Sequence, residues 1–73
     1  MASPIFTNHA LTKMKYWGIS ESQALDTFNS GAVEKRGGGN NAIKKYAGYE
    51  IGVYYVTEFG KYTILSVWKR NRR

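Results

Sequence analysis

The apolar residues of this chain repeat with one period up to residue 31 and with another period after it. In the first part they recur at the spacing of one helix face, and from Ala32 onward they alternate with polar residues. The second part is also enriched in β-branched and aromatic residues, which favour strands. The sequence therefore predicts two N-terminal helices followed by a sheet, an α+β fold.

The first helix is expected at about residues 9–17. Thr7 or Asn8 can cap its N-terminus, and Gly18 follows as a stop. Its apolar positions are Ala10, Leu11, Met14 and Trp17.

The second helix is expected at about residues 21–30. Ser20 and Gln23 have the spacing of a capping box, in which each side chain accepts a hydrogen bond from the backbone of the other. Gly31 follows as a left-handed terminator, because glycine adopts positive φ without steric strain.

Four strands are expected in the second part of the chain. They are Ala32–Arg36, Ala42–Tyr46, Tyr49–Thr57 and Tyr62–Lys69. Residues 37–41 join the first two as a mobile hairpin loop. Its three glycines lead into a strand and not into a helix, which argues against a phosphate-binding loop.

The last hairpin is expected to turn through a three-residue loop at residues 58–60. This register places Val53 opposite Leu65 and Ile51 opposite Val67, so that one face is aliphatic. The other face would carry Glu50, Gly52, Tyr54, Tyr62, Ile64, Ser66 and Trp68. A two-residue loop would pair Glu58 with Lys61 but mix the two faces, and burial should outweigh exposed ion pairs.

The chain is long enough for one hydrophobic core, so residues 1–73 are interpreted as a single domain. We expect an N-terminal arm at 1–8, two helices within 9–30, an antiparallel sheet of three to four strands within 32–69 and a basic tail at 70–73. The helices should cover the aliphatic face and leave the other face open. A core of this size without disulfides is marginal, which suggests a homodimer or a tight complex.

Several classes of protein are disfavoured by composition. The chain has no cysteine and one histidine, which argues against disulfide scaffolds, thiol chemistry and metal sites, and no cofactor is expected. No apolar run is long enough to cross a bilayer, and the first ten residues do not resemble a signal peptide. We expect a cytoplasmic protein that does not contact membranes.

Positive charge is concentrated in the second half. Residues 1–34 carry a net charge of −1 and residues 35–73 a net charge of +7. Basic residues and aromatics on an open sheet face suit single-stranded RNA. The candidate RNA contacts are Lys45, Tyr54, Tyr62, Trp68, Lys69, Arg72 and Arg73. Alternatively, the aromatics fill a dimer interface and the tail only aids solubility.

His9 is the first candidate for acid–base chemistry, because only histidine has an ordinary pKa near neutrality. Lys13 follows one helical turn later on the same edge. Metal-independent RNA cleavage needs a proton shuttle and cations at the scissile phosphate, and His9, Lys13, Arg70 and Lys45 could supply them.

Two segments resemble a known family. The segment IFTNHALTKMKYWGIS, residues 5–20, is similar to the opening of the family called domain of unknown function 4258, which reads like F-T-x-H-A-x-x-R-M-x-x-R-G-I-S. The segment ILSVWKR, residues 64–70, resembles its closing strand. That family is similar to RelE-like toxins and has been grouped with the barnase, EndoU, colicin and RelE ribonucleases.

The resemblance implies a RelE-like fold and a small endoribonuclease that is the toxin of a toxin–antitoxin pair. It would act on RNA, either free or on the ribosome, and bind an acidic antitoxin. The resemblance carries over His9, Lys13 and Ser66, with Lys13 in place of the usual arginine and Ser66 in place of a threonine. Together with Arg70, expected at the phosphate from its charge, they form the candidate catalytic set. Trp17 replaces a second common arginine, so core packing is the role expected of it.

Two other functions remain open. The same basic and aromatic face could bind RNA or DNA without cleaving it, in which case affinity would depend on salt and not on His9. The chain could also be an interaction protein that docks an acidic partner without nucleic acid.

Overall fold

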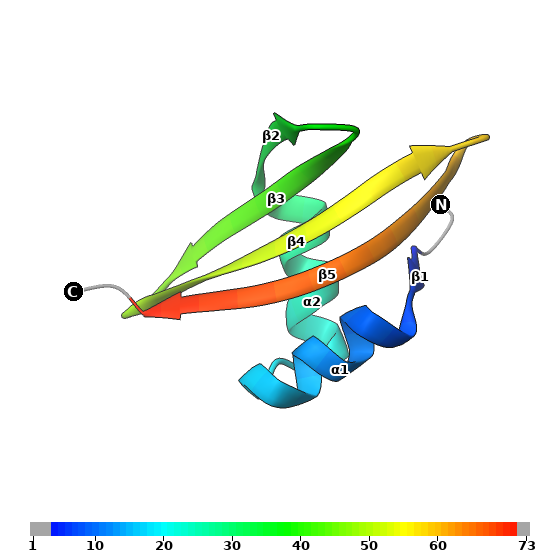
Figure 1. Cartoon of the computed structure of the whole chain (residues 1–73). Coiled ribbons are helices and arrows are strands. Elements are labelled where there is room, and N and C mark those ends of the chain that lie inside the picture. The colour runs from blue at the N-terminus through cyan, green and yellow to red at the C-terminus, as the bar shows by residue number, and fades with distance from the viewer. Residues whose placement is uncertain (1–3, 72–73) are drawn as a thin grey trace.

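The computed structural model describes residues 4–71 as two helices against one face of a five-stranded sheet (Figure 1). The elements are β1 (Ile5–Phe6), α1 (Asn8–Trp17), α2 (Glu21–Ser30), β2 (Ala32–Arg36), β3 (Gly39–Tyr46), β4 (Tyr49–Glu58) and β5 (Lys61–Asn71). The strand order is β1-β5-β4-β3-β2. Helix α1 packs against β5, and α2 against β3 and β4.

The predicted sheet of three to four antiparallel strands, of RelE-like type, is wrong. The sheet has five strands and is mixed, because β1 pairs with β5 in parallel. Strand β1 contains only Ile5 and Phe6, which pair with Thr63 and Ile64. Two residues are too few to show a two-residue period, so their sequence carries no strand signal and predicts only an N-terminal arm.

The ends of the predicted sheet also change. Residues 70 and 71 complete β5 and do not begin a tail, while Arg72 and Arg73 lie outside the described residues. The loop predicted at 37–41 is a two-residue turn, because Arg36 already pairs with Gly39.

Both helices lie where the sequence predicts them. Thr7 caps α1, Gly18 ends it at a φ of 70°, and the Ser20–Gln23 capping box is present. Gly31 was expected at positive φ, and this is wrong, since its φ is −72°. The chain leaves α2 in extended form, and a Cβ at residue 31 would collide with the Thr27 carbonyl oxygen.

Thr7 ties the start of α1 to the middle of β5. Its backbone N–H donates to the Ile64 carbonyl at 3.1 Å. Its hydroxyl oxygen lies 3.0 Å from the same carbonyl and 3.3 Å from that of Leu65, and it accepts from the Ala10 N–H at 3.2 Å. One side chain thus caps the helix and fixes where the helix meets the sheet.

The β4–β5 hairpin turns through two residues, so the predicted three-residue loop is wrong. Glu58 pairs with Lys61, and Phe59 and Gly60 both have positive φ, at 51° and 73°. Positive φ at both central residues defines a type I′ turn, whose twist matches that of the strands.

With a two-residue turn alone, each face of the hairpin would mix polar and apolar side chains. A β-bulge beside Tyr54 and Tyr55 keeps the buried face apolar. Tyr55 pairs with Ile64 but Tyr54 pairs with Ser66, which leaves residue 65 without a register partner. Val67 therefore returns to the face that Ile64 occupies, and both are fully buried. Burial decides the register, as expected, but through an inserted residue and not through the turn.

The core lies between the helices and the sheet. Its buried members are Ala10, Met14, Ile19, Ala24, Ala42, Ile51, Val53, Tyr55, Ile64 and Val67. Trp17 is partly buried and packs against this cluster, as the sequence predicts.

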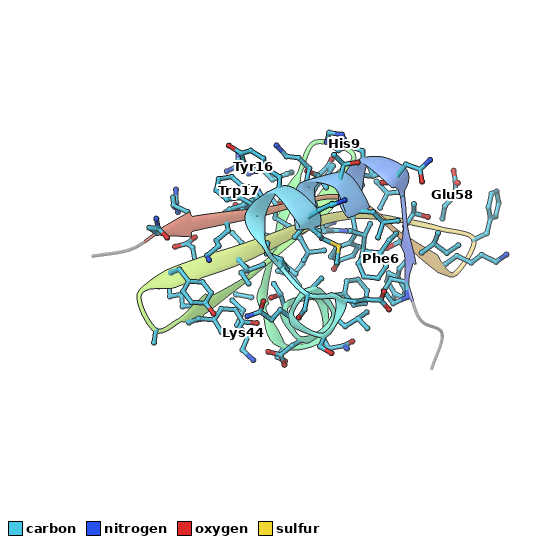
Figure 2. The ribbon with its side chains drawn as sticks, turned by 90° about the horizontal axis from the view of Figure 1, so that it is seen from below. Phe6, His9, Tyr16, Trp17, Lys44 and Glu58 are labelled. Carbon is cyan, nitrogen blue, oxygen red and sulfur yellow. The ribbon has the colours of Figure 1, made fainter. Side chains whose placement is uncertain are left out.

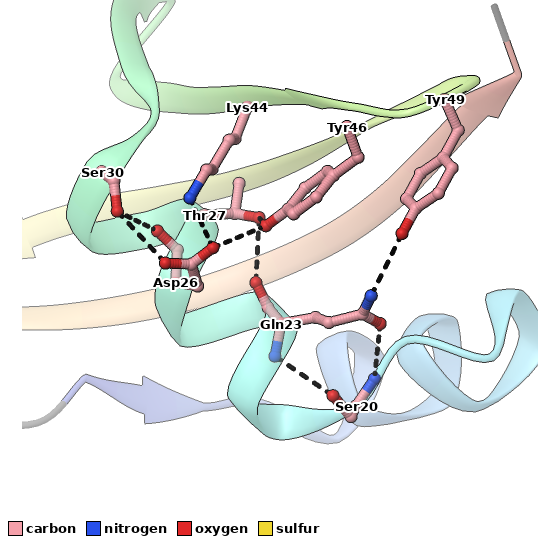
Figure 3. Close-up of polar contacts among 8 residues, drawn as sticks. All are labelled: Ser20, Gln23, Asp26, Thr27, Ser30, Lys44, Tyr46 and Tyr49. Carbon is pink, nitrogen blue, oxygen red and sulfur yellow. Dashed lines mark hydrogen bonds and ion pairs between the residues drawn. The ribbon is translucent and has the colours of Figure 1, made fainter.

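Polar contacts attach α2 to β3 (Figure 3). Lys44 Nζ lies 2.6 Å from the Asp26 carboxylate, and the Tyr46 hydroxyl donates to the same oxygen at 3.0 Å. The buried Thr27 hydroxyl lies 3.0 Å from the Tyr46 hydroxyl. The Lys44 hydrogen bond, followed by that of Tyr46, lowers the pKa of Asp26 below its ordinary value.

We expect Thr7→Val to lower the free energy of unfolding by about 1–2 kcal/mol, because it removes the helix cap and the hydrogen bond to β5. Thr12→Val is the matched control, since the exposed Thr12 hydroxyl bonds only within α1, to the Asn8 carbonyl, and its loss should stay within about 0.5 kcal/mol. Urea unfolding measures both. Equal losses in the two variants would contradict the role of Thr7.

Asp26→Asn should destabilise the protein at neutral pH and cease to matter in acid. A carboxyl whose pKa is lowered on folding stabilises the fold above its unfolded pKa, at about 4, and this contribution is lost as pH falls through the folded pKa. Urea unfolding at pH 7 and below pH 4 measures the difference between variant and wild type. A difference that does not change with pH would contradict the assignment.

Candidate nucleic-acid interface

The face of the sheet opposite the helices, here called the open face, carries three rows of paired side chains. Ile51 and Val53 of β4 are buried toward the helices, so the residues that alternate with them point the other way. Cross-strand partners share a face. The rows across β3, β4 and β5 are Lys45–Glu50–Arg70, Ile43–Gly52–Trp68 and Asn41–Tyr54–Ser66.

Trp68 lies directly on the backbone of β4. A Cβ at Gly52 would overlap the five- and six-membered rings of its indole, so glycine is the residue that allows this contact. The Arg70 guanidinium lies 5.7 Å from the ring centroid, within cation–π range. Trp68 stays partly exposed, which leaves an aromatic surface on the open face.

Tyr54 reaches across β3 in the same manner. The hydroxyl end of its ring lies against Gly39, and the hydroxyl donates to the Arg36 carbonyl at 3.1 Å. Each ring therefore lies against a glycine and is held in place, so a planar ligand would meet a preformed surface.

Glu50 is a buried carboxylate in a row of cations. Its side chain is 7% exposed, and Arg70 Nη2 lies 3.0 Å from its Oε2, whereas the Arg70 side chain is 69% exposed. On the neighbouring strand β3, Lys45 is the register partner of Glu50. These three residues, with Ile43 and residues 32–34 of β2, line a groove of about 730 Å³. Glu50 thus orients the Arg70 guanidinium, which keeps further N–H donors free to bind an anion.

Five predicted site residues share the open face, namely Lys45, Tyr54, Ser66, Trp68 and Arg70. Two others do not. Tyr62 packs edge to face on Phe28 of α2, with ring centroids 5.3 Å apart, and Lys69 Nζ lies 4.6 Å from the Tyr49 ring centroid. The predicted placement of Tyr62 and Ile64 on the open face is wrong, because the two-residue turn moves both to the helix side of the sheet, where Ile64 is fully buried. Lys69 lies on the same side as Val67, as the predicted alternation along β5 already implies.

His9 and Lys13 lie on α1. Figure 2 shows His9, Tyr16 and Trp17 along one margin of the molecule, on the β5 side. His9 is exposed, and Lys13 Nζ lies 5.6 Å from the Tyr16 ring centroid.

The predicted catalytic set is not assembled at one point. Thr7 fixes the start of α1 beside Leu65, and Arg70 lies five residues further along β5, roughly 17 Å at 3.4 Å per residue. His9 and Arg70 are therefore not brought together.

Sequence reasoning missed the roles of Glu50 and the two glycines under the rings. Glycines 39 and 52 interrupt strand-like sequence, and such a glycine signals close approach of another group. The partner of each, Tyr54 or Trp68, follows only from strand register.

Among residues 4–71, no group of three or more His, Cys, Asp and Glu is arranged to hold a metal ion. The helices of this range are too short and too polar to cross a membrane. Comparison with known proteins gave no match to a family model, to a curated protein or to a solved structure.

We expect Gly52→Ala to displace the Trp68 indole, because the added methyl group would occupy its position. In ¹H–¹⁵N spectra the Trp68 indole N–H resonance should shift, while that of Trp17, which packs on the opposite side of the sheet, serves as the internal control. Unchanged resonances for both indoles would contradict the contact.

Proposed function

We propose that this protein binds single-stranded RNA on the open face. The observation that carries the proposal is the pair of aromatic side chains, Trp68 and Tyr54, that lie against glycines of the sheet. The row next to Trp68 supplies the cations Lys45 and Arg70. Stacked bases need an aromatic surface, and the phosphates between them need cations. The net charge of +6 favours a polyanion.

A single strand suits this face better than a duplex. In an A-form duplex the bases are stacked on one another and expose only edges, so they cannot lie on Trp68 or Tyr54. The choice of RNA over DNA rests on the resemblance of residues 5–20 and 64–70 to the ribonuclease-like family.

A second candidate function is metal-independent RNA cleavage, as the toxin of a toxin–antitoxin pair with an acidic antitoxin. It is favoured by the exposed position of His9 on the helix that packs against β5, the strand of Ser66 and Trp68. The RNA 2′-oxygen would attack the adjacent phosphorus and the bond from phosphorus to the 5′-oxygen of the next nucleotide would break, leaving a 2′,3′-cyclic phosphate. His9 would accept the proton of the 2′-hydroxyl as a base or give a proton to the departing 5′-oxygen as an acid. Lys13 would stabilise the phosphate more directly than Arg70, which lies further along β5.

Binding is tested with fluorescein-labelled oligouridylate. Trp68→Ala should weaken affinity by about 5-fold to 100-fold, the range found for loss of one base–aromatic stack. Tyr16→Ala is the matched control, because Tyr16 is an exposed aromatic on α1 and away from the open face. Affinity should also fall with salt. Equal losses in both variants, or none, would refute binding on the open face.

Cleavage is tested with purified RNA in EDTA, with and without ribosomes, using wild type and His9→Ala of equal thermal stability. Products with 2′,3′-cyclic phosphate ends from wild type alone would establish the ribonuclease. Binding without cleavage in any condition would leave a non-catalytic RNA-binding protein. If neither activity is found and an acidic protein binds instead, the chain is an interaction protein.

A further inference from the structure

Phe59 combines two unfavourable features at the tip of the β4–β5 hairpin. Its φ is 51°, in the left-handed region, and it is 96% exposed. A bulky side chain rarely adopts positive φ, and type I′ turns favour asparagine or glycine at this position. Because the Phe59 side chain is exposed, no burial of apolar surface offsets this backbone strain. A strained backbone with no structural benefit points to a function for the side chain.

The tip is an extension of the strands that build the open face (Figure 1). Strand β3 pairs with β4 only as far as Tyr55, and β1 pairs with β5 only at Thr63 and Ile64. Beyond these points the hairpin is a two-stranded ribbon. Phe59 therefore stands at the end of the surface that carries Trp68, roughly 24 Å along β4 from Gly52 at 3.4 Å per residue.

The neighbours of Phe59 favour a base over an apolar protein pocket. Thr57, Glu58 and Lys61 beside it are polar or charged and exposed. Anchors in protein interfaces are surrounded by further contacts that exclude water, whereas the nearest other exposed ring, that of Tyr62, is held against Phe28 on the helix side. Stacking on a nucleobase needs only one aromatic face.

We propose that Phe59 is the outermost stacking residue of the single-stranded RNA site and contacts an unpaired base several nucleotides away from the groove at Lys45 and Arg70. This rests on the proposed function and extends it, because it defines a minimum length of RNA. Only a strand that spans the open face would reach both ends.

Oligouridylates of about 4 to about 16 nucleotides test the proposal by fluorescence anisotropy. Phe59→Asn should weaken binding of long oligonucleotides by about 5-fold to 100-fold and leave short ones, bound at the groove, unchanged. Phe59→Tyr keeps an aromatic ring and should bind as wild type. Phe59→Asn should also raise Tm by about 4–8 °C, because asparagine relieves the turn.

The outcomes separate the two proposals. Wild type that binds no oligonucleotide refutes the proposed function and this inference together. Wild type and Phe59→Asn that bind long oligonucleotides equally refute only the inference. A lower Tm for Phe59→Asn would show that the turn is not strained. Loss of self-association by Phe59→Asn, with its RNA affinity unchanged, would assign Phe59 to a protein contact. Either result overturns the inference.

Discussion

The structure depends on the junction between Thr7, the start of α1 and the bulge in β5. Strand β1 is too short to hold itself in the sheet, and α1 has no acidic residue in its first turn to stabilise its N-terminus. The N–H and the hydroxyl of Thr7 hydrogen-bond to β5 and so hold β1 in the sheet. The hydroxyl oxygen also accepts from the Ala10 N–H and so caps α1. Because the bulge lies at Leu65, beside this contact, the position of α1 and the register of β5 are fixed together.

The bulge also determines the chemistry of the open face. It allows a two-residue turn at the tip and a continuous aliphatic face beneath, with Ile64 and Val67 both buried. On the other side it aligns Trp68 with Gly52 and Tyr54 with Ser66. An aromatic surface on one side and a buried core on the other are thus two results of one inserted residue, since side chains alternate between faces along each strand.

Much of the local structure could be predicted from the sequence. The bounds of α2 and β2 and the caps at Gly18 and Ser20 follow from side-chain hydrogen bonds and φ preferences within a few residues. The candidate site was predicted in part. Residues on β3, β4 and the end of β5 converge as expected, but Tyr62 lies toward α2, and His9 lies on a helix roughly 17 Å from the level of Arg70.

The sequence alone determined the α+β class, the two helices and the net positive charge, because periodicity, capping and charge are local or additive properties. Only the tertiary structure decided that residues 5 and 6 form a parallel strand, that residue 65 is bulged and which aromatic covers which glycine. These features depend on pairing between segments up to 58 positions apart. The strand register that buries the most apolar side chains across the whole sheet is preferred, so the pairing cannot be read from any short stretch of sequence.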